Sequence, residues 1–168
     1  MAVVDRKSTQ LTNRDATPAV KVNASLAGGL VKAAKGQLTG IPSGDSSTSI
    51  YRIMELPTTA VMLIMAVANS ALGGSCAADI GVYRNTRDGG AVVDADLFAS
   101  AVSLVSTNTT PSIITGESTV MTTTKFMQPL WQAAGLSADP GGTLDICATL
   151  TADTASSGAL MLMALYVD

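Results

Sequence analysis

Few side chains in this sequence could carry out acid-base or metal chemistry. The chain has no histidine and only two cysteines, so the usual general bases and metal ligands are scarce. Residues 44–47 (GDSS) resemble the nucleophile motif of some lipases, but a serine nucleophile needs a neighbouring base that this chain does not supply as histidine. Residues 94–96 (DAD) hold two carboxylates, fewer oxygens than a hard cation requires, and are better explained as an acidic turn. We therefore expect no enzymatic activity and no cofactor or metal.

The remaining short motifs have structural or accidental explanations. Cys76 and Cys147 are far apart in apolar surroundings, where we expect small buried side chains and no mutual disulfide. Asn23 and Asn108 begin glycosylation sequons, but the N-terminus has no apolar segment typical of a secretory signal. The longest apolar run, residues 60–68, is too short for a membrane-spanning helix. We expect synthesis in a host cytoplasm and no membrane partner.

The charges are unevenly distributed along the chain. Residues 1–35 contain six basic and two acidic residues, whereas the rest contains four basic and eleven acidic residues. Residues 1–28 show no hydrophobic period, and we interpret them as an extended basic arm that docks on a partner; a solvated terminus is the alternative. The arm residues proposed to bind are Arg6, Lys7, Arg14 and Lys21. Because these cations are widely spaced and lack interleaved aromatic residues, we expect an acidic protein surface and not nucleic acid as the partner.

The composition indicates a β-rich body with a surface short of charge. Hydrophobic residues make up 47% of the chain and charged residues 14%, where about a quarter is typical. Such a surface suits burial against other subunits. Thr, Val and Ile favour strands, although abundant Ala and Met leave a mixed fold open.

Apolar runs separated by Gly, Pro, Asn and Asp predict a series of short strands. Residues 60–68 and 159–167 are apolar on both faces, which predicts strands that are central or covered by a neighbouring subunit, with a short helix as the alternative for residues 60–68. The predicted strands are residues 30–38, 49–56, 60–68, 76–83, 113–124, 143–151 and 159–167, and the last two are expected to pair.

Three further segments bear on the architecture. Residues 91–104 are predicted as two strands broken near Asp94, or as a strand leading into a helix. Residues 107–111 are predicted as a loop, and residues 126–135 as a short helix that ends at Gly135. Trp131 in that helix fits either the core or a subunit interface. We predict an all-β fold, a β-sandwich or jelly roll with one short helix, comprising a single domain over residues 29–168 behind an extended N-terminal arm, residues 1–28.

Three stretches resemble a family of tailed-bacteriophage virion proteins, the small head decoration or cement proteins. They are residues 8–20 (STQLTNRDATPAV), residues 77–104 (AADIGVYRNTRDGGAVVDADLFASAVSL) and residues 129–152 (PLWQAAGLSADPGGTLDICATLTA). The resemblance implies a β-sandwich or jelly-roll body, a homodimer or homotrimer at capsid symmetry positions, and an arm that grips the major capsid protein. It places the chain on the outer capsid surface of the virion and implies no catalytic residues.

Two other classes of function share this composition. A tail, fibre or head-tail connector subunit would also be rich in strands and poor in charge. A carbohydrate-binding or receptor-binding β-sandwich usually presents several aromatic platforms, but only 4% of this chain is aromatic. A structural virion protein is therefore the leading hypothesis.

Overall fold

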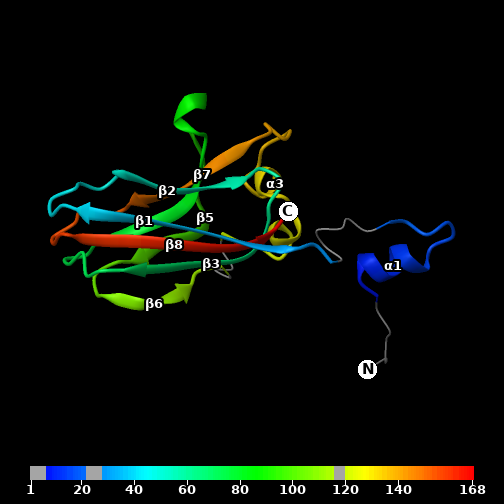
Figure 1. The fold of residues 1–168 in the computed structure, drawn as a ribbon, viewed down its shortest axis with the longest axis horizontal. Coiled ribbons are helices and arrows are strands. Elements are labelled where there is room, and N and C mark those ends of the chain that lie inside the picture. Colours follow the sequence, from blue (N-terminus) through cyan, green and yellow to red (C-terminus); the bar gives the residue numbers. More distant parts are fainter. Residues whose placement is uncertain (1–6, 22–27, 116–119) are drawn as a thin grey trace, which may run out of the picture. The chain divides into compact units, whose positions relative to one another are not determined.

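The computed structural model describes residues 7–21, 28–115 and 120–168. The chain divides into two compact units, Met1–Leu30 and Val31–Asp168, which we describe separately. The described residues of the larger unit form eight strands, and the ribbon is shown in Figure 1. In chain order they are β1 (Val31–Ile41), β2 (Ile50–Pro57), β3 (Val61–Asn69), β4 (Ala77–Tyr83), β5 (Val92–Ser103), β6 (Asn108–Ile113), β7 (Thr143–Leu150) and β8 (Gly158–Val167).

The eight strands form two four-stranded sheets with the strand order of a jelly roll. The first sheet has the order β1-β8-β3-β6 and the second β2-β7-β4-β5. Every pairing is antiparallel, and β1 pairs with β8, β2 with β7, β3 with β6 and β4 with β5. Strands 1–4 are thus matched in reverse order by strands 5–8, as when one long hairpin is rolled over itself. The predicted all-β sandwich is confirmed, and the strand order selects the jelly roll.

The core lies between the two sheets because alternate residues of each strand point inward. Leu160 and Leu162 of β8 and Ile146 of β7 are fully buried there. At one side of the sandwich, β1 approaches β2 so closely that a Cβ on Gly36 would lie 2.0 Å from the Ile53 carbonyl oxygen. Glycine at position 36 therefore allows the two edge strands to meet.

Strand β5 corrects the prediction for residues 91–104. This segment is neither a broken pair nor a strand followed by a helix; it is one strand of 12 residues with several register shifts against β4. At Ala101, φ is +52° and the backbone N–H donates to the Asp79 carboxylate at 2.7 Å. Such irregularities let a strand bend without ending, which alternation alone does not reveal.

The region between β5 and β7 also differs from the prediction. Residues 107–111, predicted as a loop, mostly belong to β6, which continues through Pro111 because proline is tolerated on an edge strand. The predicted strand at residues 113–124 is wrong, since β6 ends at Ile113 and turns follow in the described residues. The predicted helix at residues 126–135 is two short pieces, a 3-10 turn η2 (Lys125–Met127) and α3 (Leu130–Ala133), separated at Pro129. Gly135 follows α3 with φ +81°, as expected for a helix stop.

The last two strands do not pair with each other. β7 belongs to the second sheet and β8 to the first, so the turn between them crosses from one sheet to the other. The prediction that they pair is wrong because a short turn is equally compatible with a hairpin and with a sheet-to-sheet corner. β8 nevertheless lies centrally between β1 and β3, as its apolar pattern predicted.

In the smaller unit, the described part of the arm is not wholly extended. Residues Thr9–Asp15 form the helix α1, and the Ser8 hydroxyl accepts a hydrogen bond from the Leu11 N–H at 3.3 Å. A serine at this position supplies an acceptor for an N–H that the helix leaves free. No side chain of α1 is buried, so the helix has no core of its own.

Candidate interaction surfaces

The groups first considered for catalysis have structural roles in the folded chain. In residues 44–47, the Asp45 carboxylate accepts a hydrogen bond from the Tyr51 hydroxyl at 2.7 Å, and the Ser47 N–H donates to Asp153. Burial, followed by this bond to Asp45, raises the pKa of Tyr51. These bonds fix the β1–β2 connection and provide no base for a serine nucleophile.

Residues 94–96, predicted as an acidic turn, instead lie within strand β5, and Asp94 is partly buried there. Burial, followed by a hydrogen bond with Asp96, raises the pKa of Asp94, whereas Lys125, whose Nζ lies 3.4 Å from the Asp94 carboxylate, lowers it. Among the described residues, no group of three or more His, Cys, Asp or Glu side chains could hold a metal ion. Nor does any helix in the described ranges have the length and apolar character needed to cross a membrane.

Both cysteines are free and buried. Burial raises the pKa of Cys147 to about 12 and also raises that of Cys76. A thiol with a raised pKa holds little thiolate at neutral pH and is a poor nucleophile. The two side chains therefore serve as small packing residues.

The arm residues proposed to bind a partner are exposed where the structure describes them. Lys7 and Arg14 both pair with Asp15, each with a nitrogen-to-oxygen distance of 2.8 Å. The bond from Arg14, followed by that from Lys7, lowers the pKa of Asp15. Lys21 is also exposed, whereas Arg6 lies outside the described residues. The structure thus brings two of the four cations together around one carboxylate.

The outer face of the second sheet is polar and charged. Three transverse rows of paired residues form it: Ile50, Thr149 and Asp79; Arg52, Cys147 and Gly81; and Glu55, Asp145 and Tyr83. Arg52 lies across this face and donates to Asp145 at 2.7 Å and to the carbonyl oxygens of Arg84 and Gly90. Its guanidinium carbon is 5.5 Å from the centre of the Tyr83 ring, a distance typical of a cation–π contact.

The outer face of the first sheet is apolar by comparison, and we call it the methionine face. Three transverse rows form it: Lys35, Met163, Ala66 and Ile113; Gln37, Met161 and Ala68; and Ala33, Leu165 and Ile64. Met161, Met163 and Leu165 are half-buried, and Ile113 is 64% exposed. Lys35 is the sole charged member of these rows. An apolar patch that spans four strands is typical of a surface that contacts another molecule.

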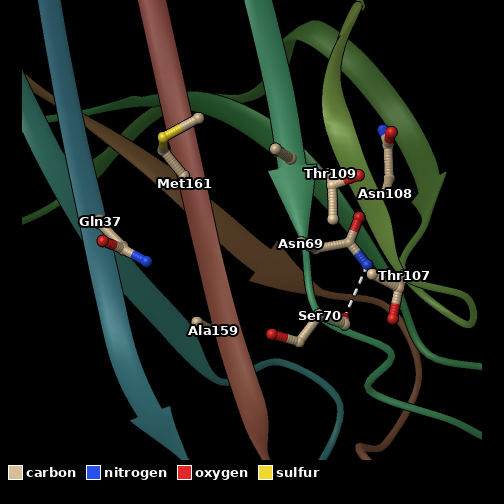
Figure 2. A pocket seen from close by; sticks show the side chains of 9 residues that line it. Gln37, Asn69, Ser70, Thr107, Asn108, Thr109, Ala159 and Met161 are labelled. Carbon is tan, nitrogen blue, oxygen red and sulfur yellow. Dashed lines mark hydrogen bonds between the residues drawn. The ribbon is translucent and has the colours of Figure 1, made fainter.

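A shallow groove of about 220 Å³ crosses one end of the methionine face (Figure 2). Small side chains at Ala68 and Ala159 leave the hollow, and amides and hydroxyls border it, including Gln37 from β1 and Thr109 from β6. Asn69 at its edge is 6% exposed and donates to the carbonyl oxygens of Ser70, Leu104 and Ser106. The groove contains no titratable side chain and offers no catalytic group.

The methionine face was only partly visible in the sequence. The two-sided apolar pattern of residues 159–167 predicted a central strand or one covered by another subunit, and β8 has both a core face and a methionine face. That Ile113 and Ala66 also belong to the methionine face could not be predicted without knowing which strands are neighbours. Trp131, considered for an interface, is half-buried in α3 beside the fully buried Leu130.

Comparisons with known proteins identify the fold. No protein-family model and no curated protein matches the sequence. Among solved structures, a chain of the Cyanophage Pam1 capsid asymmetric unit matches with a TM-score of 0.52 and 15% identity, covering 88% of this chain and 91% of that chain. A chain of the capsid of Ralstonia phage GP4 matches with a TM-score of 0.57 and 14% identity, covering 83% of this chain and 85% of that chain. The likeness extends over most of each chain, so the jelly roll is shared as a whole.

Proposed function

We propose that this chain is a structural virion protein, a decoration or cement protein that binds the outer surface of a shell of major capsid protein and stabilises it. The observation that carries the proposal is the jelly roll shared, over more than four fifths of the chain, with chains from two phage capsids. The low charge of the first sheet and the poverty in catalytic groups agree with a role in assembly and not in catalysis.

The basic arm is the element proposed to grip the shell. Helix α1 has no buried side chain, and Leu11 is 42% exposed, so the arm gains by lying against another surface. Its exposed cations favour an acidic surface, and the attraction should weaken as salt screens it. In a homodimer or homotrimer, several arms act together, and many weak contacts add through multivalency.

The test is binding of the full chain to purified shells that lack it, compared with a variant without residues 1–28. We expect deletion to reduce the bound fraction strongly at low salt, and undiminished binding would exclude the arm's role. Lys21→Glu should weaken binding, whereas Arg87→Glu, a matched single charge reversal in the exposed β4–β5 connection, should not.

A second variant tests the sign of the arm's charge. The Asp15 carboxylate neutralises part of the positive charge of Lys7 and Arg14, so Asp15→Asn raises the net positive charge of the arm without adding a cation. We expect tighter binding to shells at low salt and no difference at high salt. Weaker binding at low salt would contradict electrostatic docking on an acidic surface.

A tail, fibre or head-tail connector subunit is the neighbouring hypothesis within virion proteins. Copy number per particle separates the two, because a decoration protein is present in numbers comparable to the major capsid protein. Quantitative mass spectrometry of purified particles measures this ratio.

A further inference from the structure

We propose that the methionine face is the surface through which copies of this chain associate with one another. The inference rests on the homo-oligomeric part of the proposed function and names the surface responsible. Met161 and Met163 alternate along β8 with the fully buried Leu160 and Leu162, so their side chains lie on the outside of the sandwich. They are half-buried by neighbouring strands, and no other element is paired above them in the described part of the body.

The distribution of carboxylates favours a second copy as the occupant of this face. The body, residues 31–168, contains eleven acidic and six basic residues, so two copies repel each other on average. The strands β1, β8, β3 and β6 contain no Asp or Glu, whereas the strands of the second sheet contain Glu55, Asp79, Asp94, Asp96 and Asp145. When two copies meet through their first sheets, no carboxylate on the strands of one copy faces a carboxylate on the strands of the other.

The single charge on the face does not oppose this contact. Lys35 lies on the edge strand β1, beside Met163, and is exposed. A long lysine side chain can cover apolar surface with its methylene groups while its ammonium group stays in water. A face with a single positive charge attracts an acidic shell less than the basic arm does. We therefore assign the face to contact with a second copy and the arm to contact with the shell.

The side chains on the face suit an adaptable contact. Ala66, 1% exposed, lies between Met163 and the 64% exposed Ile113. The short alanine side chain therefore leaves a depression between two longer side chains. The unbranched methionine side chain adjusts to such relief. The groove beside Ala68 provides a further hollow on the same face.

The first experiment measures self-association of the isolated full chain by sedimentation velocity over a range of concentrations. We expect a concentration-dependent multimer, and we expect Met161→Glu to weaken association by about tenfold or more. Met161 pairs across the strands with Gln37 and Ala68, so each copy would bury a carboxylate without a cationic neighbour. The matched control is Ile50→Glu, since Ile50 is 46% exposed on the outer face of the second sheet. A monomeric wild-type chain, or unchanged association of folded Met161→Glu, would overturn the proposal.

The second experiment uses the unmodified chain and is independent of variant folding. Oxidation of methionine by dilute peroxide, read by mass spectrometry, should become slower at Met161 and Met163 as protein concentration rises. Met127, 49% exposed in η2, serves as the internal reference and should react at a constant rate. Concentration-independent rates at all three positions would overturn the proposal.

The two proposals fail separately. Self-association is measured without shells, and arm-dependent shell binding is measured without reference to the methionine face. A monomeric chain whose Met161→Glu variant loses shell binding would identify the shell as the occupant of the face and would overturn association between copies.

Discussion

At the scale of residues, most charged side chains of the body hold the fold together. Arg52 joins three segments through Asp145 and the carbonyl oxygens of Arg84 and Gly90. Asp168 accepts hydrogen bonds from Thr59 and Lys32, and these bonds, with that from Thr59 the stronger cause, lower its pKa. In the described part of the arm, residues 7–21, no charged side chain is buried in a core, which is why these charges are the candidates for binding a partner.

Asp94 makes the stability of the body depend on pH. Burial raises the folded-state pKa of this carboxyl above 3.8, so between the two pKa values the folded chain holds a proton that the unfolded chain has lost. The contribution of Asp94 to the free energy of unfolding therefore falls as pH rises through this window. We expect Asp94→Asn to gain stability relative to the wild type as the pH rises through this window. Urea unfolding at several pH values measures this difference.

The control for this prediction is Asp88→Asn, which removes one carboxylate from the exposed β4–β5 connection. If the difference in stability between the wild type and Asp94→Asn does not change with pH, the pKa of the Asp94 carboxyl is not raised in the folded chain.

Ala101 occupies a backbone conformation that favours glycine. Its φ is +52° and its side chain is exposed, so Ala101→Gly relieves strain without losing packing. We expect the free energy of unfolding to rise by about 0.5–1 kcal/mol, measured by urea unfolding. Ala99→Gly, at a buried position of the same strand, should lower it by about 1 kcal/mol. A loss of stability in both variants would contradict the assigned backbone.

At the scale of elements, the meeting of β1 and β2 is the closest approach between the sheets that we describe. A methyl group at position 36 would collide with the Ile53 carbonyl, which is backbone and cannot rotate away. We expect Gly36→Ala to lower the free energy of unfolding by about 2–3 kcal/mol. Thermal or urea unfolding checks this value.

The neighbouring exposed residue provides the control. Gln37→Ala changes no close contact between the sheets and should stay within about 0.5 kcal/mol of the wild type. Equal stability of Gly36→Ala and wild type would show that the edge strands lie farther apart.

The same scale shows why some strands were predictable and others were not. β4 begins with alternating buried and half-buried residues, β7 alternates over most of its length, and β8 is apolar on both faces, so sequence patterns located all three. β6 contains Pro111 and five other positions that are polar or exposed, and its identity as a strand depends on pairing with β3. Which sheet receives β7 and which receives β8 depends on packing of the whole chain and not on the turn between them.

At the scale of the whole molecule, composition predicted the class of fold and the separation of charge, but not the surface that faces a partner. The scarcity of charge was visible in the sequence. That the strand carboxylates are all in the second sheet becomes visible only when β1, β8, β3 and β6 are known to form the first sheet. The body is a jelly roll with one outer face that carries a single charge and one that is polar and charged, and the N-terminal arm is basic. We propose that this chain decorates the outside of a phage shell.

A cryo-EM map of the particle that incorporates this chain tests that claim most directly. We expect jelly-roll density repeated over the outer surface of the shell, with the arm lying on the major capsid protein and methionine faces of adjacent copies in contact. Density confined to the tail or the connector, or located inside the shell, would contradict it.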